Sequence, residues 1–354
     1  MQSPAARRPR RAYGTRWHDR ITDRIRRRFV SAKVATEVNR RNRYRGPQAV
    51  ETLAPPPLIE DHRPTSQAMP RVDARTGMSL GGVALMTGSL MVVAFLMHII
   101  FLSQVYYIKQ QQVLFDDFRY ALANATAPVG QVTQEDALVP QGTPVAIVKI
   151  DKIGVNAVVV EGTSSSATLS GPGHRRDTSL PGQLGTSVIY GRQFTYGGTF
   201  TDLGKLAKGD KIVATTGQGE HTYVVDDIRY TGDPIPVTDD TKGHLTLVSA
   251  AGLALFPSSV VRVDAHLTST PADTPAQMFT VESLSQSELP MYGDSGAWAL
   301  LALEIVFLGV IMVLLWLSFR FWGNLQTWIV AVPLTLVLGI ATSIQVTLLL
   351  PNLI

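Results

Sequence analysis

The chain offers little nucleophilic chemistry, because its 354 residues include no cysteine. This absence excludes a thiolate nucleophile, a disulfide, and zinc or iron–sulfur sites built on cysteine, and it leaves the redox compartment undecided. Ser249 supplies a hydroxyl group, and His174, His244 and His266 supply imidazoles in the same part of the chain. A serine nucleophile needs a base held against it, and the sequence places none beside Ser249. No carboxylate cluster indicates a calcium site, so we expect no metal and no cofactor.

Short segments of alternating polar and apolar residues begin near Val145 and predict an all-β domain. They read VAIVKI, NAVVVEG, SVIYG, DKIVATT, HTYVVDDIRYTG, LTLVSA and VVRVDAHL, and Gly, Pro, Asp and Asn separate them. Seven or eight short strands in about 125 residues are typical of a β-barrel or a β-sandwich. Periodicity alone does not choose between these two.

A series of short motifs in this domain resembles the sortase family in order and spacing, and is most similar to the class E, actinobacterial type. The motifs are Lys149–Val155, Val160–Thr163, Leu169–His174, Thr178–Gly185, Ser187–Gly191, Thr195–Phe200, Thr215–Gly219 and Leu245–Ser249, and Val260–Leu267 supplies the last strand. The resemblance implies an eight-stranded sortase barrel on the outer face of a membrane. In active sortases a cysteine thiolate attacks the Thr–Gly amide of a sorting signal such as Leu-Pro-any-Thr-Gly, and a cell-wall or pilin amine resolves the thioacyl enzyme. A histidine protonates the leaving amine, and an arginine steadies the oxyanion.

The resemblance places other side chains at all three catalytic positions. The family's Val-Ile-Ala-Gly-His-Arg strand matches Val188–Gln193, so Arg192 stands for the histidine. The Thr-Leu-any-Thr-Cys segment matches residues 246–250, so Ala250 stands for the cysteine. Counting back five residues from Ala265 puts Val260 in place of the arginine. We therefore expect no enzyme but a pseudo-sortase, a catalytically inactive binding or scaffolding module in the bacterial cell envelope.

The former active centre is interpreted as a groove for a peptide or an anion. Its expected members are Arg192, Gln193, Tyr196, Thr246, Ser249 and Arg262. Because Arg262 follows Val260 by two residues on a strand, it shares a face with that position. With Arg192 it would form an anion site, or merely a solvated cationic patch. His174, in a Gly-Pro-Gly-His turn that active relatives share, is interpreted as a structural loop residue.

Two other functions stay open. The first is an active sortase-family transpeptidase or hydrolase that uses Ser249 or a residue of a partner. The second is a subunit of a membrane complex whose three-helix bundle is the essential part. Mutation of Ser249 tests the first, and deletion of the barrel tests the second.

Three long apolar segments predict membrane-spanning helices. Residues 80–102 form a stretch of 23 residues without a formal charge, which is long enough to cross a hydrocarbon layer of about 30 Å. Residues 297–319 and 328–350 follow as a helical hairpin. Antiparallel spans would put their polar residues, His98, Glu304 and Gln345, in the outer third of the bilayer. We expect these three to form one intramembrane polar cluster.

Charge is divided unevenly along the chain and predicts its orientation. Residues 1–77 hold 18 Lys and Arg against 7 Asp and Glu. Cationic flanks stay on the cytoplasmic side, so the N-terminal region is expected inside, and residues 103–296 and Ile354 outside, the bacterial cytoplasmic membrane.

The cationic arm carries an apolar stripe of Trp17, Ile21, Ile25 and Phe29 among arginines, which predicts an amphipathic helix over about residues 16–40. Such a helix lies on an anionic leaflet, docks to a partner or, least favoured, touches nucleic acid. The expected partners are therefore membrane lipids and a cell-envelope or membrane protein, with no nucleic acid.

These inferences divide the chain into successive parts. They are a basic cytoplasmic arm with a Pro-rich linker (1–79), a first span (80–102), a stalk or linker (103–142), the sortase-like barrel (143–270), a second linker (271–296) and two further spans (297–319 and 328–350). The stalk is expected to prolong the first helix to about Ala123.

Overall fold

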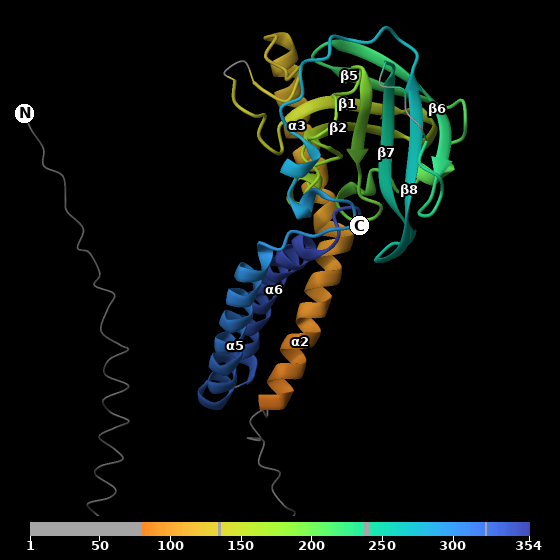
Figure 1. Cartoon of the computed structure of the whole chain (residues 1–354). Coiled ribbons are helices and arrows are strands. Elements are labelled where there is room, and N and C mark those ends of the chain that lie inside the picture. The colour runs from red at the N-terminus through yellow and green to blue at the C-terminus, as the bar shows by residue number, and fades with distance from the viewer. Residues whose placement is uncertain (1–79, 134–135, 237–238, 240, 323) are drawn as a thin grey trace, which may run out of the picture. The chain divides into compact units, whose positions relative to one another are not determined.

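The computed structural model describes residues 80–354 except 134–135, 237–238, 240 and 323. The amphipathic helix and the Pro-rich linker expected within residues 1–79 lie outside the described residues. Figure 1 shows the described part as a β-barrel together with long helices.

The barrel consists of eight strands that close on themselves in the order β1-β2-β3-β4-β7-β8-β6-β5 (Figure 1). The strands are β1 (Pro144–Ile150), β2 (Val155–Glu161), β3 (Gly173–His174), β4 (Gly185–Tyr190), β5 (Lys211–Thr216), β6 (Gly219–Arg229), β7 (Gly243–Leu253) and β8 (Phe256–Leu267). The pairs β2–β3 and β4–β7 are parallel, and the other neighbours are antiparallel. The expected eight-stranded sortase-like barrel is thus confirmed.

Alternation along the strands separates the barrel interior from its outer face. On β7, Leu245 and Leu247 belong to the buried core, while Val248 and Ala250 belong to a separate apolar cluster. Successive residues of a strand point to opposite faces, so the register of β7 decides which side chains face the core.

Within the described residues, three helices are long and apolar enough to cross a membrane. The first runs from α2 (Leu80–Met97) through a π-helical turn, η1 (His98–Leu102), into α3 (Ser103–Ala123). The other two are α5 (Ala297–Phe321) and α6 (Asn324–Leu349). The last two extend further toward each other than hydropathy indicates, because helical hydrogen bonding continues past the last apolar residue.

Helix α2 packs closely against α6, and α3 contacts the barrel. A Cβ atom added at Gly339 of α6 would lie 2.7 Å from the Cβ of Ala94, so only glycine permits this approach. On the barrel side, Leu114 and Phe118 of α3 pack against Val158 and Val160 of β2. The first helix therefore contacts both the helical hairpin and the barrel.

We expect Leu247→Ala to lower the free energy of unfolding by about 2–5 kcal/mol, because Leu247 is fully buried and its truncation leaves a cavity. The matched control is Leu253→Ala on the same strand, where the side chain is 74% exposed and the change should stay within about 0.5 kcal/mol. Thermal and denaturant unfolding of the full chain in detergent measures both. Equal effects of the two substitutions would contradict the burial given for Leu247.

Candidate functional site

The positions that the resemblance aligns with the catalytic cysteine and arginine face each other across two strands. Ala250 of β7 and Val260 of β8 are directly paired, and each is less than one-tenth exposed. Together with Tyr190 and Val248 they form an apolar cluster outside the main barrel core. This pair offers a methyl and an isopropyl group, which neither attack a carbonyl nor donate a hydrogen bond.

Arg192, which follows β4, is buried with only 2% of its surface exposed. Its guanidinium donates to the carbonyl oxygens of Ser165 (3.0 Å), Thr168 (3.3 Å) and Ile354 (3.1 Å). It also donates to the hydroxyls of Thr168 (3.2 Å) and Thr195 (3.0 Å). All five acceptors are oxygens of the chain itself.

The position of Arg192 corrects the expectation of an open cationic groove. Burial lowers the pKa of Arg192 to about 10, so the group keeps its charge near neutral pH. A charge this deeply buried, with each of its three nitrogens hydrogen-bonded to the chain, is neither a solvated patch nor a free anion site.

The segment Leu350–Ile354, which follows α6, covers the paired positions. Leu353 is fully buried and belongs to the same apolar cluster as Ala250 and Val260. Its carbonyl oxygen accepts a hydrogen bond of 2.9 Å from the backbone N–H of Gln193. The sequence did not predict this contact, because nothing in five mostly apolar residues after a span indicates a partner more than 150 residues away.

Ser249 lies on the opposite face of β7 from Ala250. Its side chain is fully buried, and its hydroxyl donates to the carbonyl oxygen of Gly191 at 2.9 Å. A hydroxyl that points into the barrel and has a carbonyl as its acceptor has no base to remove its proton.

The other expected groove residues have separate partners. The Gln193 side chain donates to the carbonyl of Gly252, in the β7–β8 hairpin, at 2.9 Å. Thr246 donates to Asp264 at 2.8 Å, and Asp264 is also paired with Arg229. Arg262 is directly paired with Val248 on β7 and is half-buried, so it shares the outer face with Ala250 and Val260. Among the described hydrogen bonds, Arg192 and Arg262 share no acceptor.

Tyr196 faces the first helix. It is 3% exposed, and its hydroxyl lies 2.9 Å from Nε2 of His98 in the π-helical turn. Its ring meets the ring of Tyr106 edge-on at 5.7 Å, and the Arg192 guanidinium lies 5.5 Å from its centre. Tyr196 therefore joins the buried arginine to the helix, and it does not line an open groove.

Comparison with known proteins agrees with this architecture. Residues 148–251 match the sortase domain family. Sortase D of Bacillus subtilis (strain 168) is 33% identical over 84 residues, which cover 24% of this chain and 41% of that protein. A solved structure of sortase E from Streptomyces avermitilis is 30% identical, with a TM-score of 0.33, over 43% of this chain and 100% of that one. The chain carries a sortase domain.

A second solved structure, the Clostridium perfringens sortase D5 transpeptidase, is 22% identical over 47% of this chain and 99% of that one, with a TM-score of 0.38. The match to the curated Bacillus sortase spans about two fifths of that protein. The helices α2, α3, α5 and α6 lie outside the matched residues 148–251.

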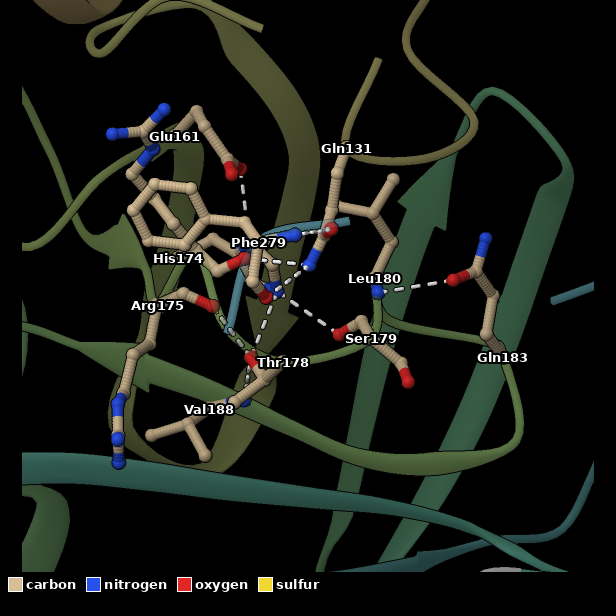
Figure 2. A network of polar contacts seen from close by, with 11 residues as sticks. Gln131, Glu161, His174, Arg175, Thr178, Ser179, Leu180, Gln183, Val188 and Phe279 are labelled. Carbon is tan, nitrogen blue, oxygen red and sulfur yellow. Dashed lines mark hydrogen bonds and ion pairs between the residues drawn. The ribbon is translucent and has the colours of Figure 1, made fainter. Parts of the chain in front are cut away.

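His174 of the sortase barrel forms a buried pair with Glu161 (Figure 2). Its Nδ1 lies 2.9 Å from the Glu161 carboxylate, and its Nε2 lies 2.9 Å from the carbonyl of Ser179. Both nitrogens face acceptors, which requires both to carry protons. Although burial opposes protonation, the charge and hydrogen bond of Glu161 and the Ser179 carbonyl outweigh it, and the pKa of His174 is raised. This arrangement supports the structural interpretation of His174.

Gln131, which follows α3, ties the segment after β8 to this network (Figure 2). Its amide oxygen accepts from the backbone N–H groups of Met278 and Phe279, each at 2.7 Å. Its amide nitrogen donates to the carbonyl of Arg176 at 2.8 Å. Among the described residues there is no group of three or more His, Asp and Glu side chains that could hold a metal ion.

Of the three polar residues expected to cluster in the long helices, one has a described hydrogen-bond partner. His98 is buried, and its described partner is Tyr196 of the barrel. One carboxylate oxygen of Glu304 and the amide oxygen of Gln345 are buried without a hydrogen-bond partner. The cluster expected of these three residues stays a prediction.

We expect the stability of the full chain to fall as pH rises through the raised pKa of His174. In the unfolded chain the imidazole titrates near pH 6.5, so the folded state binds the proton more tightly. The stabilisation is fully present below pH 6.5 and is lost above the folded pKa. His174→Gln should remove this pH dependence and lower the stability at acidic pH by about 1–3 kcal/mol.

Thermal unfolding between pH 5 and pH 9 measures this effect. The matched control is His266→Gln, whose pair with Asp226 is 43% and 45% exposed and so contributes little. If the His174 variant kept the pH dependence of the parent chain, the buried imidazolium–carboxylate pair would not be its source.

Proposed function

We propose that this chain is a membrane-anchored pseudo-sortase, a catalytically inactive binding or scaffolding module in the bacterial cell envelope. The observation that carries the proposal is the pairing of Ala250 with Val260, together with a buried Arg192 whose three side-chain nitrogens are all hydrogen-bonded to the chain. A sortase needs a nucleophile, a proton donor for the leaving amine and an oxyanion partner. A methyl group at position 250 cannot attack a carbonyl, and an isopropyl group at position 260 cannot donate to an oxyanion. Arg192, with a pKa of about 10, does not give up a proton near neutral pH.

The alternative of a serine enzyme has less support. Ser249 faces the barrel core and donates to the Gly191 carbonyl, so a substrate on the outer face meets Ala250 first. His174, whose imidazole is committed to Glu161 and Ser179, is not free to act as its base.

A retained binding role is supported by what covers the catalytic positions. Residues 350–354 read Leu-Pro-Asn-Leu-Ile, and their first two residues are those that open the sorting signal of active sortases. The cleft, by which we mean the face of the barrel that carries Ala250, Val260 and Arg192, thus has a peptide segment against it. Its partner in the envelope is expected to be a membrane or cell-wall protein, which copurification in mild detergent followed by mass spectrometry would identify.

A second candidate is a membrane-complex subunit whose three-helix bundle is the essential part. It is favoured by Glu304 and Gln345, each of which has a buried oxygen without a partner among the described residues. Polar groups within apolar spans usually face other helices. Expression of the spans without residues 143–270 discriminates the two, because only the second candidate keeps the cellular function without the barrel.

We expect the full chain to neither cleave a Leu-Pro-any-Thr-Gly peptide nor transfer it to an amine. Ser249→Ala should behave like the parent chain in both assays, because its hydroxyl is committed to Gly191. Mass spectrometry after incubation with the peptide measures any acyl adduct. A covalent adduct on Ser249 of the parent chain, absent from the variant, would overturn the proposal.

The proposed orientation places the barrel outside the cytoplasmic membrane and the α5–α6 turn inside, because the Arg-rich arm stays in the cytoplasm. The cysteine-free chain allows single exposed cysteines at Lys208 on the barrel and Gln326 at the turn. An impermeant maleimide should label Lys208→Cys on intact cells and Gln326→Cys only after the membrane is opened. The reverse pattern would invert the topology.

A further inference from the structure

Residues 352–354 are among the most deeply buried of the described residues, and Leu350 and Pro351 before them are half-buried. The exposed fractions of Asn352, Leu353 and Ile354 are 0%, 0% and 3%. Segments that follow a helix usually run over the surface, where water satisfies their backbone groups. Here the barrel and the segment before α5 satisfy them, and each contact can be named.

Both the nitrogen and the oxygen of the Asn352 side-chain amide form hydrogen bonds. Its Nδ2 donates to the carbonyl of Thr163 at 2.7 Å and to that of Leu289 at 3.0 Å. Its Oδ1 accepts from the backbone N–H of Met291 at 3.0 Å. These partners require a side chain that has both hydrogen-bond donors and an acceptor, and an amide supplies both. An aspartate of the same shape would instead put a carboxylate against two carbonyl oxygens.

The backbone of the segment is bound as well. The carbonyl of Leu350 accepts from the Ser165 hydroxyl at 2.8 Å, and that of Asn352 accepts from the Thr168 hydroxyl at 3.2 Å. The carbonyl of Leu353 accepts from the Gln193 N–H at 2.9 Å.

A charged side chain binds the backbone of Ile354. The carbonyl oxygen of Ile354 accepts from the Arg192 guanidinium at 3.1 Å, a charge-assisted bond in a buried setting. The Thr195 hydroxyl donates to the same oxygen. The guanidinium that replaces the imidazole thus contacts the segment directly.

One side chain supplies the apolar anchor. Leu353 packs against Ala250, Val260, Tyr190 and Val248, and these small or flat side chains leave room for it. Main-chain hydrogen bonds combined with one apolar pocket and one polar pocket are the usual means by which proteins recognise an extended peptide.

We propose that the cleft of the sortase barrel is a peptide-binding site and that residues Leu350–Ile354 of the same chain are its ligand. The ligand class is a short peptide in which an asparagine is followed by a large apolar residue. Because the segment continues directly from α6, its binding fastens the third long helix to the barrel. The inference deepens the proposed function. It rests on that function in one respect only, namely that a cleft occupied by a segment of its own chain is treated as a binding site.

The test uses a cysteine introduced at position 250 of the full chain in mild detergent. Ala250 is 2% exposed beneath Leu353, so Ala250→Cys should react slowly with a maleimide. Adding Asn352→Asp should raise the labelling rate about tenfold or more, because the carboxylate loses the amide's donors and releases the segment. The matched control, Asn156→Asp at an exposed position of β2, should leave the rate unchanged.

A second variant keeps the test independent of that substitution. Deletion of residues 351–354 should expose the introduced thiol at position 250 to the same extent, and an amidated Leu-Pro-Asn-Leu-Ile peptide should then protect it. The reversed peptide, Ile-Leu-Asn-Pro-Leu, has the same composition and should give no protection. Lys208→Cys serves as the reference for labelling of an open position.

Fast labelling of the Ala250→Cys variant with an intact segment would overturn the inference, and so would protection by neither peptide or by both equally. These outcomes differ from a failure of the proposed function. An active enzyme is detected by cleavage or an acyl adduct in the parent chain, whereas the labelling rate reports only what covers position 250.

Discussion

The buried guanidinium of Arg192 is the constraint on which the surrounding structure depends. A charge taken out of water needs acceptors for its donors, and each donor left unpaired costs about 1–3 kcal/mol. Its acceptors come from Ser165 and Thr168, from Thr195 and from Ile354. Three stretches of chain far apart in sequence must therefore converge on one side chain. Its contact with Tyr196 extends this convergence to His98 of the first helix.

On the paired strands β7 and β8, the proposed loss of reactive groups and the proposed gain of a binding surface would be the same physical change. A thiolate or a second guanidinium at positions 250 and 260 would carry charge and require polar surroundings. Ala250 and Val260 require the opposite, and Leu353 supplies it by completing an apolar cluster. At these positions the outer face of the two strands is part of a buried apolar cluster.

Much of the fold could be predicted, because the features that determine it are local. Alternation in segments such as SVIYG and LTLVSA indicates strands, and long uncharged segments indicate the three apolar helices. The burial of Arg192 could not be predicted, since arginine is seldom buried and its acceptors are mostly backbone carbonyls. The motif around Tyr196 predicts a place in the groove, but the contact of this residue with His98 depends on how the first helix approaches the barrel. The partners of Asn352 lie in segments that no periodicity connects to it.

Residues 350–354 are covalently attached to α6, and this attachment affects how well any other peptide can compete with them for the cleft. A ligand attached to its own binding site competes at an effective concentration that a short connection raises to about the millimolar range. Here the connection is α6 itself, and Asn352 follows its last residue by only three positions. A free peptide with the same contacts would therefore have to be abundant, or would have to bind a chain in which α6 has moved. Under the proposed function the bound segment can stay in place, whereas turnover by an enzyme would require product to leave. A module that joins a barrel to a membrane helix gains from it, because the bound segment transmits the position of the helix to the barrel through hydrogen bonds that end at Arg192.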